Sequence, residues 1–172
     1  MKKRTYRKIA VKEVDVAVVA AELGSGRAVF AIDVAKVDMV ATIVAGDGRV
    51  VRTVCWKNPG ENGLALQLLS GLRRAGLSVE AVMESSGTYG DVLRHQLLEH
   101  GVPVYRVSGK RTHDAAEVYD GVPSLHDAKS AAIIAKLHLD RASTPWGPLS
   151  ERSESSRLPS RPWTCTASST SG

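Results

Sequence analysis

Three acidic residues lie where an α/β protein presents side chains to solvent. Asp33 directly follows the apolar run 28–32. Glu84 follows the largely apolar run 79–83, and Asp127 begins a segment with helical spacing. Ligands gather at the carboxyl ends of parallel strands, so Asp33 and Glu84 meet if their strands are neighbours. Clustered carboxylates repel one another and are tolerated when a cation neutralises them, and oxygen ligands favour Mg²⁺ or Mn²⁺. Two such ions can activate an attacking oxygen and stabilise a leaving oxygen on phosphorus.

Each acid, taken alone, also has a structural interpretation. An acid after a strand often serves in a turn, and the helix dipole favours an acid such as Asp127 in the first turn. Glu84 fits this interpretation least, because it follows five largely apolar residues and precedes a turn that contains Gly87.

The pattern around these acids predicts an α/β fold with a mixed sheet. Residues 28–57 form an antiparallel meander of three strands, whose Asp47-Gly48 turn is typical of a hairpin. Leucines at helical spacing follow, and the predicted order is then strand 79–83, helix 89–100, strand 102–107 and helix 124–139. Alanines give the last helix a small face that can pack tightly.

The charge of the chain is uneven. The formal net charge is +5, but residues 1–12 carry six bases and no acid, whereas residues 13–140 carry 13 bases and 16 acids. The first segment is either a phosphate-binding arm or a solvated one. The two cysteines lack metal-ligand spacing and indicate a reducing compartment. No apolar run is long enough to span a membrane, and charges within residues 11–23 argue against a signal peptide.

The last part of the chain changes composition. Residues 141–172 hold nine Ser and four Pro, too little apolar surface to offset ordering entropy, so we expect an unstructured tail. Shifting the frame by one base across residues 159–167 gives a pattern like an ordinary helix. Our hypothesis is a frameshifted, truncated chain, and the alternative is a natural Ser-rich linker. An uninterrupted downstream frame at the locus would favour the frameshift.

Three ordered motifs carry a resemblance to a family. The segments 31–36 (AIDVAK), 83–89 (MESSGTY) and 121–136 (GVPSLHDAKSAAIIAK) resemble the DEDD-type insertion-sequence transposases. The resemblance covers roughly residues 28–146. It implies an RNase H-like (RuvC-like) nuclease domain in which Asp33, Glu84 and Asp127 bind Mg²⁺ and support DNA strand cleavage and transfer. It also implies a bridge-type guide RNA, a homo-oligomer, and a second domain with a catalytic serine.

Two features depart from that family pattern. The final helix of the family carries a second Asp three residues after the first, on the same helix face. Here that position is Ser130, a weaker ligand than a carboxylate, and Asp120 is a possible substitute. The serine domain is also missing. We therefore divide the chain into a basic arm or helix (1–27), a RuvC-like domain (28–146) and a tail (147–172).

Several basic residues are candidate nucleic-acid contacts, with solvated surface positions as the alternative. They are Lys36, Arg106, Lys110, Arg111 and Lys129. Two other functions compete with a cytoplasmic transposase. One is a binding-only remnant that contacts DNA or RNA, or pairs with an intact transposase. The other is a fragment of a sugar kinase-like or actin-like ATPase, which the residues 34–36 (VAK) disfavour, because phosphate binding after Asp33 needs glycines and hydroxyls.

Overall fold

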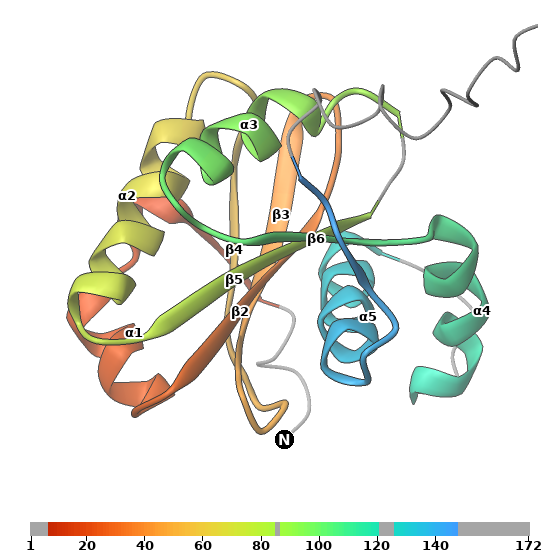
Figure 1. Cartoon of the computed structure of the whole chain (residues 1–172), viewed down its shortest axis with the longest axis horizontal. Helices are drawn as coiled ribbons and strands as arrows, with labels where there is room; N and C mark the ends of the chain where they lie inside the picture. Colours follow the sequence, from red (N-terminus) through yellow and green to blue (C-terminus); the bar gives the residue numbers. More distant parts are fainter. Residues whose placement is uncertain (1–6, 85–86, 121–125, 148–172) are drawn as a thin grey trace, which may run out of the picture.

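The computed structural model describes residues 7–84, 87–120 and 126–147, which build one sheet with helices on both faces (Figure 1). The strands are β1 (Lys8–Ala10), β2 (Arg27–Asp33), β3 (Asp38–Ala45), β4 (Val50–Lys57), β5 (Ser78–Glu84), β6 (Val104–Val107) and β7 (Thr144–Pro145). The helices are the short 3-10 helix η2 (Val11–Glu13) and α1 (Val16–Leu23), α2 (Asn62–Arg74), α3 (Asp91–Glu99), α4 (Gly109–Asp120) and α5 (Asp127–Leu139).

The sheet has the order β1-β4-β3-β2-β5-β6-β7. Strand β3 runs antiparallel to both β2 and β4, whereas β2, β5 and β6 run parallel to one another. This confirms the predicted mixed sheet, in which an antiparallel meander of three strands precedes parallel strands. The parallel pairing of β2 with β5 places their carboxyl ends side by side.

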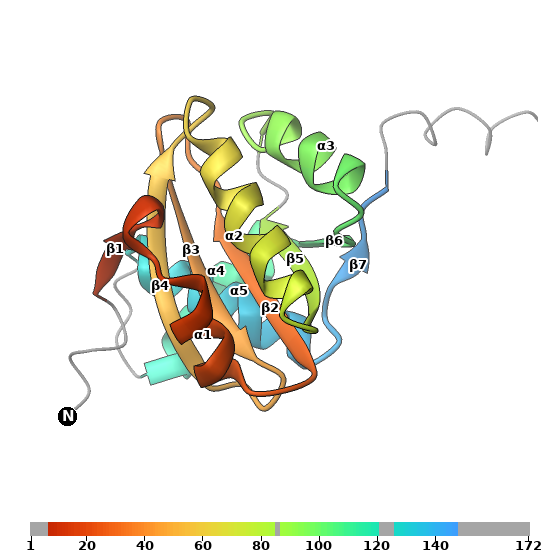
Figure 2. The ribbon, with the colours of Figure 1, turned by 90° about the vertical axis from the view of Figure 1, so that its left-hand side faces the viewer.

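Alternation along the strands divides the core between two faces. In β2, Phe30 and Ile32 pack in the cluster that contains residues of α2 and α3. Val29 and Ala31 point the other way and pack against Ile134 of α5. Accordingly, α1, α2 and α3 cover one face, and α4 and α5 cover the other (Figures 1 and 2). The alanines predicted to line the last helix are buried, so α5 lies close to the sheet.

The segment before β2 belongs to the same core. Strand β1 pairs in parallel with β4, and Val11, Val19 and Leu23 are buried in the cluster under α2. The prediction left residues 1–27 as a basic arm or helix, and for residues 8–23 this was incomplete, because the segment adds a strand to the sheet. Residues 1–6 and 148–172, including most of the predicted tail, lie outside the described residues. None of the described helices is long and apolar enough to cross a membrane.

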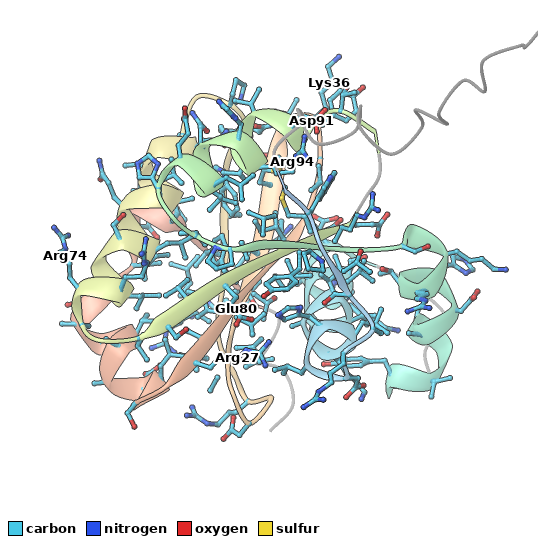
Figure 3. The ribbon with its side chains drawn as sticks, viewed as in Figure 1. Arg27, Lys36, Arg74, Glu80, Asp91 and Arg94 are labelled. Atoms are coloured by element: carbon cyan, nitrogen blue, oxygen red, sulfur yellow. The ribbon has the colours of Figure 1, made fainter. Side chains whose placement is uncertain are left out.

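A polar cluster fastens the end of α5 to the sheet. The ring of His138 is buried, and its Nε2 lies 2.8 Å from Glu80 Oε2 and 2.9 Å from the Arg27 guanidinium. Arg27 also donates to Glu80 at 2.7 Å, as Figure 3 illustrates. The other ring nitrogen lies 2.6 Å from Ser143 Oγ, and the Tyr105 ring packs against the imidazole. Burial, with the charge of Arg27, lowers the pKa of His138.

We predict that His138→Ala lowers the free energy of unfolding by about 2–4 kcal/mol, through a cavity and lost hydrogen bonds. Because the folded-state pKa of His138 lies below its unfolded value, the wild type loses stability as pH falls through the ordinary histidine range. The gap between wild type and variant therefore narrows in acid. Urea denaturation at several pH values measures this. His95→Ala on the exposed face of α3 is the control, expected within about 0.5 kcal/mol of wild type. Equal losses in both variants would contradict the role of the cluster.

Candidate functional site

The candidate site lies where β2 and β5 end. Asp33 is the last residue of β2 and shares the strand face of Val29 and Ala31, so its carboxylate points toward the α5 side. Glu84 is the last residue of β5 and stands two positions after Val82, which faces α5 in the same way. The register pairs the residues just before them, Ile32 with Met83. The structure therefore brings the two predicted carboxylates together.

Helix α5 supplies the third carboxylate. Asp127 is its first residue, and His126 caps the helix by accepting the Lys129 backbone N–H at 3.2 Å. The Asp127 side chain is 56% exposed and accepts a hydrogen bond from Lys8 Nζ at 3.0 Å. Lys8 comes from β1, 119 residues earlier in the chain. The ammonium thus offsets negative charge at the site.

Electrostatics show that the three acids share one environment. The pKa of Asp33 is raised to about 7, first by burial and then by the charges of Asp127 and Glu84, with Lys8 acting in the opposite direction. Burial removes water that would solvate the carboxylate, and neighbouring negative charges favour its protonated form. A strongly shifted carboxyl in a cluster of acids is typical of a functional site.

Asn58 ties together the loops that carry these acids. Its side-chain amide donates to the carbonyl oxygens of Ala35 at 3.3 Å and Tyr89 at 3.1 Å. Ala35 follows Asp33, and Tyr89 lies between Glu84 and α3. The Asn58 backbone N–H also donates to Val37 at 2.8 Å. Sequence analysis did not single out Asn58, because nothing local indicates which distant carbonyls it reaches.

Gly109 lies close to the carboxylate of Glu84. A Cβ atom at Gly109, the first residue of α4, would lie 2.8 Å from Glu84 Oε1. The start of α4 therefore closes against the carboxylate on the side of the sheet edge. Neither α4 nor this contact was predicted from the sequence.

The other predicted site residues lie in different settings. Ser130 is one helical turn after Asp127 and is half-buried, as a fourth ligand position would require. Lys36 is exposed in the loop after β2, at the upper rim in Figure 3. Arg106 on β6 and Lys110 and Arg111 in the first turn of α4 are also exposed.

Lys129 does not fit its predicted role. Only 1% of the residue is exposed, so it does not present its charge to a nucleic acid, and that prediction was wrong. The reason is the close approach of α5 to the sheet, which buries the flank of its alanine face. Asp120, the possible substitute ligand, is the last residue of α4 rather than a loop residue, and its side chain lies outside the described part of the chain.

Comparison with known families decides the identity of the domain. The family model of the DEDD transposases of IS110, described as "Transposase", matches residues 30–155, which is well over half of the chain. This chain belongs to that family. The match favours a DNA transposase over the kinase-like ATPase and over the binding-only remnant. No curated protein matches this transposase chain.

Solved structures give weaker likenesses to this transposase domain. Two are RuvC of Thermus thermophilus and the same protein in complex with a Holliday junction substrate, both 16% identical, with TM-scores of 0.47 and 0.49. These alignments cover 69% and 70% of this chain and 99% of each RuvC chain. The ethanolamine utilization protein EutJ from Carboxydothermus hydrogenoformans is 14% identical, with a TM-score of 0.37, over 54% of this chain and 40% of its own.

We predict that Asp33→Asn stabilises the transposase domain at pH 8 without divalent cations. Because the folded-state pKa lies above the unfolded value, the ionised carboxylate costs stability above about pH 7, and this cost disappears as pH falls toward 4. The gain at pH 8 is on the order of 1 kcal/mol, since partial solvation reduces the effect. Thermal melts at pH 8 and pH 5 measure it. Asp114→Asn, at an exposed position of α4, is the control. A gain that did not shrink in acid would refute this account.

Proposed function

We propose that this chain cleaves and transfers DNA strands at the site of Asp33, Glu84 and Asp127. Membership in a transposase family supports the reaction class. The observation that carries the assignment to these residues is the parallel register of β2 and β5, which ends both strands in an acid at the same end of the sheet. The pKa of Asp33, raised first by burial and then by Asp127 and Glu84, agrees with it. Isolated turn or cap residues would not perturb one another in this way.

We further propose that the site uses Mg²⁺ or Mn²⁺ held by Asp33, Glu84 and Asp127, with Ser130 alongside. The donor set fits such a cation in type and charge, because all three acids offer oxygen ligands and their repulsion calls for a positive charge. Among the described residues, no group of three or more acids, histidines or cysteines is close enough to hold a metal. Binding therefore requires the side chains to draw together and Asp127 to leave Lys8.

A bound divalent cation would supply charge that activates an attacking oxygen and stabilises a leaving oxygen on phosphorus. The chain's own residues prepare the site for this. Asp33 must be deprotonated to act as a ligand, which its pKa of about 7 allows at neutral pH and above. Lys36, three residues after Asp33, and Lys110, next to the Gly109 that approaches Glu84, have exposed side chains that carry positive charge. These cations would attract the DNA backbone without a requirement for sequence.

The remaining binding partners that we propose rest on the family resemblance alone. We propose that the intact enzyme works as a homo-oligomer with a bridge-type guide RNA. Its compartment would be the cytoplasm, which agrees with the reducing environment indicated by its cysteines.

We predict Mg²⁺-dependent nicking of supercoiled plasmid DNA by the wild-type chain. Asp33→Ala should reduce the rate at least about a hundredfold, since even groups that only orient metal ligands contribute 10–100-fold. Gel analysis of plasmid topology with Mg²⁺, with Mn²⁺ and with EDTA measures this. Asp114→Ala is the matched control and should nick like the wild type. DNA binding without metal-dependent nicking would indicate the binding-only remnant, and nicking retained in Asp33→Ala would remove Asp33 from the site.

We predict that Ser130→Asp tightens Mg²⁺ binding, because a carboxylate replaces a neutral hydroxyl one helical turn from Asp127. A rise in melting temperature with added Mg²⁺ reports binding independently of activity. The Mg²⁺ concentration that gives half of this rise should be severalfold lower in the variant than in the wild type. Ser130→Asn, similar in size but uncharged, is the control. An unchanged Mg²⁺ titration would place the fourth ligand elsewhere.

A further inference from the structure

A basic pocket lies at the edge of the sheet, outside the carboxylate cluster. It has a volume of about 310 Å³ and forms where the end of β6, the start of α4 and β7 meet. Its lining residues are Arg106, Ser108, Arg111, Ala142 and Thr144. Two guanidinium groups and two hydroxyls therefore converge on one hollow, and no acid lines it.

Both arginines are held in place by the segment 142–144, which forms the other wall of the pocket. Arg106 Nε donates to Thr144 Oγ1 at 3.3 Å, and Arg111 Nη1 donates to the Ala142 carbonyl oxygen at 3.1 Å. Within the described part of the chain, neither guanidinium forms an ion pair, in contrast to Arg27 with Glu80. Each therefore keeps N–H donors and an unneutralised charge for a ligand.

The wall itself is anchored. The Trp146 backbone N–H donates to the Val104 carbonyl oxygen at 2.8 Å, which holds the residues after β7 against β6. Arg94, which is 3% exposed, lies over the Trp146 ring at 4.6 Å and donates to Gly147 O at 3.0 Å. Figure 3 shows Arg94 next to Asp91, which lies 3.2 Å from its guanidinium. The pocket is thus built on a fixed edge rather than on a free loop.

We propose that this pocket binds a backbone phosphate of the DNA strand on which the carboxylate site acts. Guanidinium groups bind phosphate through paired, charge-assisted hydrogen bonds, and hydroxyls such as those of Ser108 and Thr144 are common donors to phosphate oxygens. An apolar ligand or a cation would leave the two arginines unpaired. The inference rests on the proposed function, and it adds the site at which the DNA strand is held.

The position of the pocket relative to the carboxylates suits one continuous strand. Ser108 lines the pocket, and the next residue, Gly109, closes against Glu84. Strands β2, β5, β6 and β7 are consecutive in the sheet, so about 10–15 Å separates Asp33 from the edge at 4.7–4.9 Å per strand. Phosphates along one DNA strand advance about 3.4 Å each along the helix axis and lie farther apart than that around it, so the pocket would hold a phosphate within a few nucleotides of the reacting one.

The test measures binding of a short fluorescein-labelled DNA duplex by fluorescence anisotropy. The buffer contains EDTA, so that neither metal nor cleavage contributes. The double variant R106Q/R111Q should bind about tenfold more weakly at low salt. Its plot of log affinity against log salt should be less steep by about 0.9, the value for one lost phosphate contact on duplex DNA. The variants replace exposed side chains, and circular dichroism checks their folding.

Arg74→Gln is the control, because Arg74 is also exposed but lies at the far end of α2, away from the pocket (Figure 3). Affinity and slope equal to those of the control would overturn the proposal. A loss confined to an RNA duplex of the same sequence would overturn the assignment to DNA. The two proposals fail separately. Normal nicking with an unchanged slope refutes the pocket alone, whereas a reduced slope without any nicking refutes the carboxylate chemistry alone.

Discussion

Repulsion among three carboxylates is the constraint on which this domain depends. Burial first, and then the charges of Asp127 and Glu84, raise the pKa of Asp33 to about 7. A protein without use for such a cluster would separate the acids or replace one of them, because the ionised arrangement costs stability. The fold instead holds the acids at one edge and offsets part of their charge with Lys8.

The architecture supplies the rigidity that this repulsion demands. Parallel pairing of β2 and β5 fixes Asp33 and Glu84 through the register of the sheet rather than through flexible loops. Helix α5 can bring Asp127 to the same edge because its buried face consists largely of alanine, which allows close packing on β2. At the opposite end of α5, the contacts of His138 with Glu80 and Arg27 resist any sliding of the helix. The position of Asp127 is therefore set from both ends of the helix.

Sequence analysis predicted what local patterns determine and missed what only long-range packing determines. The ends of β2 and β5 were predictable because an apolar run that ends in an acid is visible within a few residues. Lys8 and Asn58 were missed at the site because their partners are far away in the chain, 119 residues in the case of Lys8. The prediction for Lys129 was wrong for a related reason, since its burial depends on how closely α5 approaches the sheet.

The distribution of charge implies a division of labour between binding and chemistry. The segment 13–140 is acidic overall, and its carboxylates repel the phosphates that a transposase must handle. Affinity for DNA at the proposed site therefore depends on basic side chains nearby or on a bound cation. Two further basic side chains, Arg106 and Arg111, lie at the sheet edge and line a pocket without acids. Under the proposed function, affinity placed beside the carboxylates, rather than among them, would let the strand dock before the reacting phosphate meets the negative charge, and this would leave the acids free to respond to a cation.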